Sequence, residues 1–309
     1  MVESSQANKA AMTELGERLD ALRGPAFVGA IGMLVGVFAA GAAALQALST
    51  RTSLLQLQPH AADATLHEEA IRAATRDYQG ACLSLLVCAI ATLVYYAMLR
   101  VRARARDAAH IEDVIEQFDS AKEMPTEKLK RLQERASNID LTAIGLRHVD
   151  WALTLPLLTV EIFMMLRHPF GVDEQWWGCL LAAGFAFACI ATGYFAGTAS
   201  RTQSGDSFFW LTFAVSCALF VGMGTCLLAI TVQRLDDAAP DGYQRKRTAG
   251  VVFSLLWIFY PIVSLYGRCK EPPSGYSHYA AYTTEATYAV LDVVSKTGLA
   301  LFLLWNGLP

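Results

Sequence analysis

Residues 147–161 read RHVDWALTLPLLTVE, an apolar stretch that nevertheless carries three charged side chains. On an α-helix, Arg147, Asp150 and Glu161 fall on one stripe, because they occupy positions i, i+3 and i+14 of the 3.6-residue repeat. A charged side chain at the centre of a bilayer costs about 2.5–3.5 kcal/mol even on a lenient insertion scale. If this helix spans a membrane, its charges are therefore expected to serve a function.

The composition indicates an integral membrane protein. Of the 309 residues, 54% are hydrophobic and only 17% are charged, whereas soluble domains carry about 25% charged residues. Apolar runs of about 20 residues, long enough to cross about 30 Å of hydrocarbon, recur along the whole chain. The sequence predicts an all-α bundle of seven transmembrane helices in the lipid bilayer, at approximately residues 26–48, 79–99, 145–166, 176–197, 208–232, 249–267 and 284–305.

Charge, cysteine usage and the N-terminal segment argue against several other classes of protein. The net charge is −3, and no basic run with interleaved aromatic residues suggests a nucleic-acid partner. The seven cysteines show no metal-finger or CxxC spacing, and six lie in predicted spans, so we expect free thiols. Residues 1–24 lack the apolar centre of a signal peptide, so we expect a polar N-terminal tail preceding one membrane domain, 25–309.

Two connections between the predicted spans are long. Residues 49–78 are polar, and no helix breaker follows Pro59, which predicts that the second helix extends beyond the bilayer. Residues 100–144 are expected to form an extra helical extramembrane segment that packs on the bundle or on a neighbouring subunit, with a solvated charged loop as the alternative. After Pro125, TEKLKRLQERA predicts a second short helix. The helical interpretation rests first on an apolar stripe at Ile111, Val114, Ile115 and Phe118.

The last predicted span contains a second group of charges. In ATYAVLDVVSKTGLALFLLW, residues 286–305, Asp292 and Lys296 lie one turn apart on one helix face. One interpretation is a buried pair that only neutralises itself. The functional interpretation is a lysine that forms a Schiff base with a carbonyl compound, as amine nucleophiles do.

Three motifs in three different spans resemble the signatures of microbial rhodopsins. RHVDWALTLPLL (147–158) resembles the third-helix signature, LWIFYP (256–261) the sixth-helix signature, and LDVVSK (291–296) the retinal-lysine motif. IATGYFAG (190–197) is similar to the fourth helix of proteorhodopsins, and AIATLVYY (89–96) fits the second helix more loosely. The resemblance covers all seven spans in order, but not 100–144. It implies a seven-helix bundle of microbial rhodopsin type, which is not an enzyme, with all-trans retinal covalently bound to Lys296 as a protonated Schiff base.

The resemblance also implies how the charges pair. Asp150 and Asp292 match the two counterions of the Lys296 Schiff base. The Schiff base and Arg147 then supply two positive charges against two carboxylates, so the cluster is neutral, as a buried charge cluster requires.

The resemblance further assigns the residues that contact retinal, although helix packing alone would also explain each aromatic or small side chain. The assigned pocket residues are Trp151, Thr154, Leu158, Gly193, Trp257, Tyr260, Pro261 and Tyr95. Of these, Tyr260 and Tyr95 are expected to donate hydrogen bonds to Asp292. Ser264 stands where the family usually has another tryptophan, which predicts an unusual chamber around the retinal ring.

Asp150, Thr154 and Glu161 match the acceptor, threonine and donor of proteorhodopsin-like proton pumps. Chloride and sodium pumps carry different residues at these positions and are therefore disfavoured. At 1.5 Å per residue, Glu161 lies about 16 Å along the helix axis from Asp150. We therefore expect a light-driven proton pump in which Asp150 accepts the proton, while Glu161, neutral in the dark, supplies the next one. A light-gated ion channel and a sensory photoreceptor of the same family are the alternatives.

Several expectations depend on location and partners. The family topology, in the plasma membrane with the N-terminus outside, implies outward pumping. Most Lys and Arg residues then lie outside, contrary to the positive-inside rule, and a reversed insertion would pump inward. We expect a homo-oligomer.

Other polar residues have two interpretations each. His148 is either a partner of the counterion or an interfacial histidine, and Glu285 is either a proton-release group or a solvated glutamate. HEE at 67–69 and HIED at 110–113 are surface clusters that either bind a divalent metal or form solvated helix faces.

Overall fold

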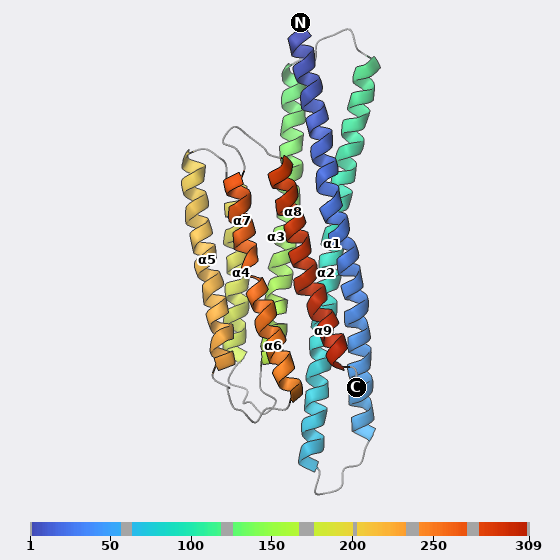
Figure 1. Cartoon of the computed structure of the whole chain (residues 1–309), viewed down its shortest axis with the longest axis vertical. Coiled ribbons are helices and arrows are strands. Elements are labelled where there is room, and N and C mark those ends of the chain that lie inside the picture. The colour runs from blue at the N-terminus through green and yellow to red at the C-terminus, as the bar shows by residue number, and fades with distance from the viewer. Residues whose placement is uncertain are drawn as a thin grey trace.

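The computed structural model describes residues 2–56, 64–118, 126–166, 176–199, 203–232, 241–270 and 278–307, and these segments are almost entirely helical (Figure 1). The helices are α1 Val2–Gln56, α2 Ala64–Phe118, α3 Thr126–Leu166, α4 Trp176–Thr198, α5 Gln203–Val232, α6 Asp241–Leu256, α7 Phe259–Lys270, α8 His278–Asp292, the π-helix η3 Val293–Thr297, and α9 Gly298–Gly307.

Seven helical segments are long and apolar enough to cross a membrane, which confirms the predicted seven-helix bundle. They are Gly24–Gln56, Ala70–Ala103, Ile144–Met165, Trp176–Thr198, Gly205–Ala229, Arg247–Lys270 and Tyr282–Trp305. Helices α6 and α7 form the sixth of these, and α8, η3 and α9 form the seventh. Chain neighbours pack side by side from α1 to α5, and α1 also packs against α8, η3 and α9, which closes the bundle.

Three helices are much longer than their membrane spans (Figure 1). The first part of α1, the last part of α2 and the first part of α3 extend together beyond the other helices at the end where the N-terminus lies. At the opposite end, the last part of α1 and the start of α2 extend beyond the bundle, which agrees with the predicted extension of the second helix. The bundle therefore has a three-helix extension at one end and a two-helix extension at the other.

The 100–144 segment is helical, but it differs in one respect from the separate element expected from the sequence. α2 continues without interruption to Phe118, and α3 begins at Thr126, so the described parts of this segment are continuations of two spanning helices. The physical reason is that α2 contains no proline, and no glycine after Gly80, to interrupt its backbone hydrogen bonds. The apolar stripe at 111–118 lies among residues whose side chains are outside the description.

The sixth span is interrupted beside a proline. Pro261 has no backbone N–H, so the carbonyl oxygen of Trp257 accepts instead from the N–H of Tyr260, at 3.2 Å. Trp257 and Ile258 themselves donate three residues back, at 3.3 and 3.1 Å, and form the turn between α6 and α7. This tightened turn directs the Trp257 side chain into the interior, where it is buried.

The seventh span is interrupted at Lys296. Residues Val293–Thr297 form a π-helical turn, and the N–H of Gly298 bonds to the carbonyl oxygens of Val293 and Val294. π-turns often occur at functional sites because they change the direction in which one side chain points. Here the turn buries Ser295, Lys296 and Thr297 inside the bundle.

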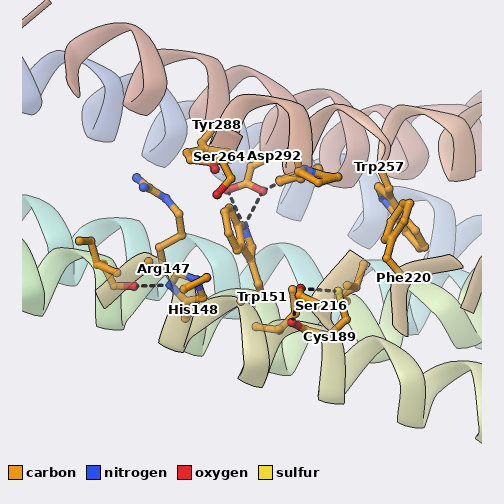
Figure 2. Close-up of a pocket in the computed structure, with 18 of the residues that line it drawn as sticks. Arg147, His148, Trp151, Cys189, Ser216, Phe220, Trp257, Ser264, Tyr288 and Asp292 are labelled. Atoms are coloured by element: carbon orange, nitrogen blue, oxygen red, sulfur yellow. Dashed lines mark hydrogen bonds between the residues drawn. The ribbon is translucent and has the colours of Figure 1, made fainter. Parts of the chain in front are cut away.

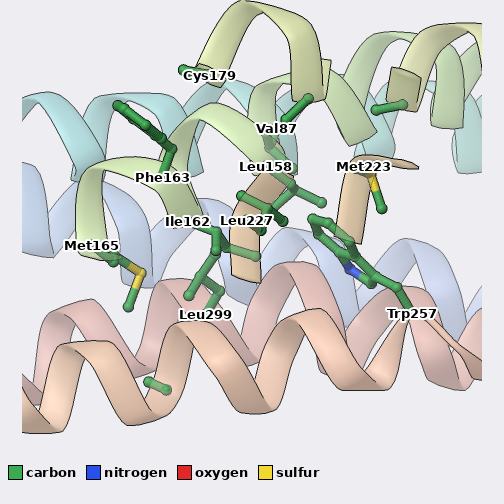
Figure 3. Close-up of a cluster of buried hydrophobic side chains, with 13 residues drawn as sticks. Val87, Leu158, Ile162, Phe163, Met165, Cys179, Met223, Leu227, Trp257 and Leu299 are labelled. Carbon is green, nitrogen blue, oxygen red and sulfur yellow. The ribbon is translucent and has the colours of Figure 1, made fainter. Parts of the chain in front are cut away.

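The largest buried apolar cluster fills the bundle on one side of Lys296 (Figure 3). Figure 3 shows Leu158 and Ile162 of α3 beside Trp257, with Leu299 of α9 facing them. Met223 and Leu227 of α5 join the same cluster. This apolar cluster includes Leu158, Ile162, Phe163 and Met165, so it surrounds the last turns of α3.

Candidate functional site

The ε-amino group of Lys296 lies between two buried carboxylates. Its Nζ atom donates a hydrogen bond to Asp150 Oδ2 at 2.5 Å and lies 3.7 Å from Asp292 Oδ1. The Lys296 and Asp292 side chains come from adjacent turns of the last span, and Asp150 comes from α3. All three are at most 2% exposed, so each charge depends on the others for compensation.

Asp292 is surrounded by hydrogen-bond donors. The hydroxyl groups of Tyr95 and Tyr260 donate to its two oxygens at 2.6 and 2.7 Å, and Trp151 Nε1 donates at 3.0 Å. Both oxygens of Asp292 therefore accept hydrogen bonds from neutral donors in addition to facing Lys296.

Asp150 has fewer partners than Asp292. Lys296 Nζ bonds its Oδ2 atom, whereas the buried Oδ1 atom has no hydrogen-bond partner among the described residues. The Thr154 hydroxyl does not bond to this carboxylate, because it donates to the Asp150 backbone carbonyl oxygen at 2.8 Å. Asp150 therefore accepts fewer hydrogen bonds than Asp292 does.

A second charge cluster lies on the side of the three-helix extension. Arg147 makes a two-pronged contact with Glu285, in which Nη1 donates at 2.5 Å and Nη2 donates to the other oxygen. Arg102 of α2 also donates to Glu285, at 3.0 Å. The Glu285 side chain is only 14% exposed, so it is a largely buried member of a charge cluster and not a solvated residue at a helix end.

Lys296 opens into a cavity of about 340 Å³ that lies between α3, α4, α5 and the sixth and seventh spans (Figure 2). Seven of the eight residues assigned to the retinal pocket line this cavity: Trp151, Thr154, Leu158, Gly193, Trp257, Tyr260 and Pro261. The eighth, Tyr95, does not line it and lies against Asp292. In this structure, Tyr95 therefore contacts the Asp292 carboxylate and not the cavity wall.

The wall between α4, α5 and α7 contains several small polar side chains. The Ser216 hydroxyl donates to the Cys189 carbonyl oxygen at 2.9 Å, and its oxygen lies 3.3 Å from the Cys189 sulfur (Figure 2). Ser264 lines the cavity and hydrogen-bonds to Tyr288. Because serine is much smaller than tryptophan, the cavity extends into this region and acquires a polar wall.

Glu161 lies within the largest apolar cluster, between Leu158 and Ile162 on α3. Its side chain is fully buried, and the Ser84 hydroxyl of α2 donates to Oε1. Its Oε2 atom has no hydrogen-bond partner among the described residues. Leu158, Ile162 and neighbouring apolar residues pack around this part of α3. Among the described residues, the Ser84 hydroxyl is the hydrogen-bond partner of this carboxyl group, and no cation forms an ion pair with it.

Sequence reasoning missed Arg102 and Ser84. Both lie on the buried face of α2 that carries Tyr95, because Ser84, Tyr95 and Arg102 occupy positions i, i+11 and i+18. This spacing is present in the sequence. However, Arg102 was assigned to the 100–144 connection, and Ser84 carries no charge that would mark it as a site residue.

The contacts of His148 include neither Asp150 nor Asp292 in the described part of the chain. Its Nδ1 atom bonds to the Ile144 carbonyl oxygen at 2.8 Å, and its ring packs edge-on against Trp151 and Tyr194. The side chain therefore joins α3 to α4, and the expected alternative of a counterion partner has no support in its contacts.

The described residues contain no group of three His, Cys, Asp or Glu side chains able to hold a metal ion. The 110–113 cluster and Glu69 of the 67–69 cluster lie outside the residues whose side chains are described. All seven cysteines are free thiols, as expected.

The fold and the site define a class of protein: a seven-helix membrane bundle with a buried lysine, paired with carboxylates, that faces an aromatic cavity. A family model described as "Bacteriorhodopsin-like protein" matches residues 69–307. The chain belongs to this family, the microbial rhodopsins, whose chromophore is retinal on a lysine.

Curated relatives match about half of the chain. A sensory rhodopsin of Halorubrum sodomense is 29% identical over 162 residues, which cover 52% of this chain and 56% of the relative. Opsin-1 of Neurospora crassa is 29% identical over 160 residues, covering 51% of this chain and 47% of the relative. The chain therefore spans about half the length of the curated relatives it matches.

Solved structures share the fold over nearly the whole chain. Xanthorhodopsin, described as a light-driven ion pump with dual chromophore, has a TM-score of 0.55 at 19% identity, covering 92% of this chain and 93% of that one. The transmembrane domain of the Salpingoeca rosetta rhodopsin phosphodiesterase has a TM-score of 0.54 at 13% identity, covering 99% and 96%.

The residues present fit a retinal chromophore. A primary amine opens into a cavity whose wall combines Trp151 and Trp257 with Leu158 and Pro261. Such a wall suits a long apolar polyene, and the two carboxylates beside Lys296 suit a positive charge at its attachment point.

Proposed function

We propose that this protein is a light-driven proton pump that uses all-trans retinal covalently bound to Lys296. The observation that carries the proposal is the arrangement of two buried carboxyl groups on α3. Asp150 contacts Lys296 Nζ at 2.5 Å, and Glu161 lies about 16 Å further along the helix, within the apolar cluster of the last turns of α3. A pump needs both groups, because the proton must leave on one side and return from the other.

When bound, retinal supplies light absorption and an isomerisation that changes the direction of the Lys296 Nζ proton. Asp150 Oδ2 is the acceptor for this proton, since it already receives the hydrogen bond from Nζ. Asp292 is not the acceptor, because its two oxygens already accept hydrogen bonds from Tyr95, Tyr260 and Trp151.

Glu161 then returns a proton to Lys296. Burial keeps its carboxyl group neutral, and the Ser84 hydroxyl holds its Oε1 atom in position. The apolar side chains around Leu158, Ile162 and Leu299 prevent protons from passing through the bundle before Glu161 gives its proton to Lys296. The two carboxyls thus have opposite protonation states in the dark, which suits one for accepting and the other for donating.

With the N-terminus outside, Asp150 and the Arg147–Glu285 pair face the exterior, Glu161 faces the cell interior, and pumping in the plasma membrane is outward. The test is the light-induced pH change of cells that express the protein with added retinal, with and without a protonophore. The proposal predicts acidification of the medium that the protonophore abolishes. Alkalinisation that the protonophore abolishes would contradict the outward direction, and a coloured protein that changes no pH would contradict pumping.

A sensory photoreceptor is the second candidate, because one matched relative is a sensory rhodopsin. A sensor needs a long-lived signalling state, so it would show a slow photocycle and no sustained proton current. A light-gated channel would instead give a current whose sign reverses with voltage. Assembly into a homo-oligomer is also part of the proposal and is tested by the mass of the purified protein in detergent.

A further inference from the structure

Arg102 takes part in a contact that the pumping scheme does not use. Its Nη2 atom donates to Glu285 Oε2 at 3.0 Å, and Arg147 Nη2 donates to that same oxygen. The Arg102 side chain is 2% exposed, so it is buried as completely as Lys296. Burying a second arginine is costly unless its charge is compensated, and Glu285 supplies that compensation.

Glu285 determines where the Arg147 charge lies. Both terminal nitrogens of Arg147 bond to Glu285, and its guanidinium carbon lies 5.0 Å from the centre of the Tyr288 ring. Figure 2 shows the Arg147 side chain extending from α3 on the side of Tyr288, at the opposite end of the cavity from Trp257. Its positive charge is therefore shared with Glu285 and is not directed solely at Asp150.

Among the described side chains around Lys296 and Glu285, the positive and negative charges are equal only if Arg102 is counted. Lys296, Arg147 and Arg102 supply three positive charges, and Asp150, Asp292 and Glu285 supply three negative ones. Without Arg102, the Glu285 carboxylate would neutralise the Arg147 guanidinium. Lys296 would then be left to compensate the negative charges of both Asp150 and Asp292.

We propose that Arg102 and Glu285 are positioning residues: together they hold Arg147 in its outer location and set the net charge that Asp150 experiences. The inference rests on the proposed function, because it assigns Asp150 as the acceptor. Arg102 acts on Asp150 only through Glu285 and Arg147 and is not itself a catalytic residue.

Other ionisable groups face these residues and must be counted. Asp150 experiences the charges of Lys296, Asp292 and Arg147. Glu285 is faced by Arg102 from α2 and by Arg147 from α3. In the described part of the chain, the remaining neighbours are His148 beside Arg147 and the tyrosines and the thiol around the two carboxylates. The tyrosines and the thiol stay neutral near pH 7: Tyr95, Tyr260, Tyr288 and Cys88.

The test is the pH dependence of the dark absorption spectrum of the retinal-bound full chain, because protonating Asp150 removes a charge beside the chromophore and shifts its colour. Arg102→Gln removes a cation, so the midpoint of the colour transition should move to higher pH by about one unit. Glu285→Gln removes an anion and leaves Arg147 available to Asp150, so the midpoint should move to lower pH. The double variant should return to within about half a unit of the wild type.

Two further variants serve as controls. Arg102→Lys keeps the charge and should keep the midpoint. Arg100→Gln removes an arginine two residues away on the exposed side of α2, where it stacks on Tyr96, and should also leave the midpoint unchanged. A purely structural role for Arg102 would not shift the midpoint in opposite directions in the two single variants.

Shifts of the same sign in both single variants, or shifts no larger than that of Arg100→Gln, would overturn the inference. If Arg102→Gln fails to form pigment, Glu285→Gln decides alone, and an unchanged or raised midpoint overturns the inference. Light-driven pumping of the wild type is measured in parallel. An unshifted midpoint in a pumping protein rejects only this inference, whereas opposite shifts in a coloured protein that does not pump reject only the pump.

Discussion

The two carboxylates beside Lys296 differ in how well their charges are supported. Asp292 accepts hydrogen bonds from three neutral donors, whereas Asp150 depends on Lys296 itself. Moving a proton from Lys296 to Asp150 removes two charges from a buried site and leaves the Asp292 network intact. In the proposed pump, this asymmetry of partners favours Asp150 as the acceptor.

Asp150→Asn tests this assignment. The amide cannot accept the proton, so light-driven acidification should fall to less than about one hundredth of the wild-type rate. The rate is measured with a pH electrode in a suspension of expressing cells. Asp206→Asn is the control, because Asp206 is half-exposed and pairs with Arg268 away from Lys296; acidification by Asp150→Asn at the control rate would remove Asp150 as the acceptor.

Glu161→Gln tests the donor. Reprotonation of Lys296 should slow by about 100-fold, and added azide should restore it, because a small diffusible acid can replace the missing carboxyl group. Flash photolysis measures the recovery of the dark absorption. The exposed Glu68→Gln of α2 should recover at the wild-type rate; an equally fast recovery in Glu161→Gln would exclude Glu161.

At the scale of single residues, the sequence predicted site residues best where one helix carries all residues of a motif. Asp150, Thr154 and Glu161 follow one another on α3, so their motif could be read directly. Ser84 and Arg102 could not be paired in this way, because their partners lie 77 and 183 residues away along the chain. Such contacts depend on how α2 is rotated in the bundle, which one sequence does not specify.

At the scale of the elements, α1 approaches the π-helical turn closely. The Thr297 hydroxyl donates to the Gly32 carbonyl oxygen at 2.8 Å. A Cβ atom on Gly36 would lie 2.7 Å from Cys88 Sγ and from Thr297 Oγ1. Glycine at this position therefore permits the helix contact that supports the turn carrying Lys296.

Gly36→Ala should accordingly destabilise the protein by about 1–3 kcal/mol, because the added methyl group overpacks the contact with η3. The expected readout is a lower thermal midpoint for loss of the pigment colour. Gly41→Ala on the same helix is a matched control, since a Cβ there meets nothing within 4 Å. Equal midpoints for the two variants would show that the close contact is not needed.

The seven spans were predicted correctly because their apolar runs are long and contain few charged residues. The full lengths of α1, α2 and α3 were not, because a hydropathy rule sees only the part of a helix that lies in the membrane. The helical flanks rest instead on strong helix formers such as alanine, arginine and glutamate. The π-turn at Lys296 was also not predicted, since it changes the backbone without leaving a sequence signal.

At the scale of the whole molecule, the bundle has two different ends. The N-terminus of α1 and the last residues of α7 lie at the same end (Figure 1). Arg147, Arg102 and Glu285 lie on the side of Lys296 toward that end, and Glu161 lies on the other side. In the proposed pump, the direction of transport therefore depends on which end faces the cell exterior.

Cys269 reports this orientation. It is the exposed cysteine among the seven thiols, and it lies one residue before the end of α7. With the N-terminus outside, a membrane-impermeant maleimide added to intact cells should label it. Cys269→Ser should abolish the labelling; labelling of the wild type only after the cells are broken would reverse the orientation and predict inward pumping.

The central claim is that one proton passes from Lys296 to Asp150 and the next comes from Glu161. Time-resolved infrared difference spectroscopy of the light-activated protein measures both steps directly. The account predicts that a carboxylic acid C=O band first appears, and that a second C=O band is then lost while Lys296 is reprotonated. The first band should be missing in Asp150→Asn and the second in Glu161→Gln. A wild-type reaction in which no carboxyl group becomes protonated after Lys296 loses its proton would contradict the account.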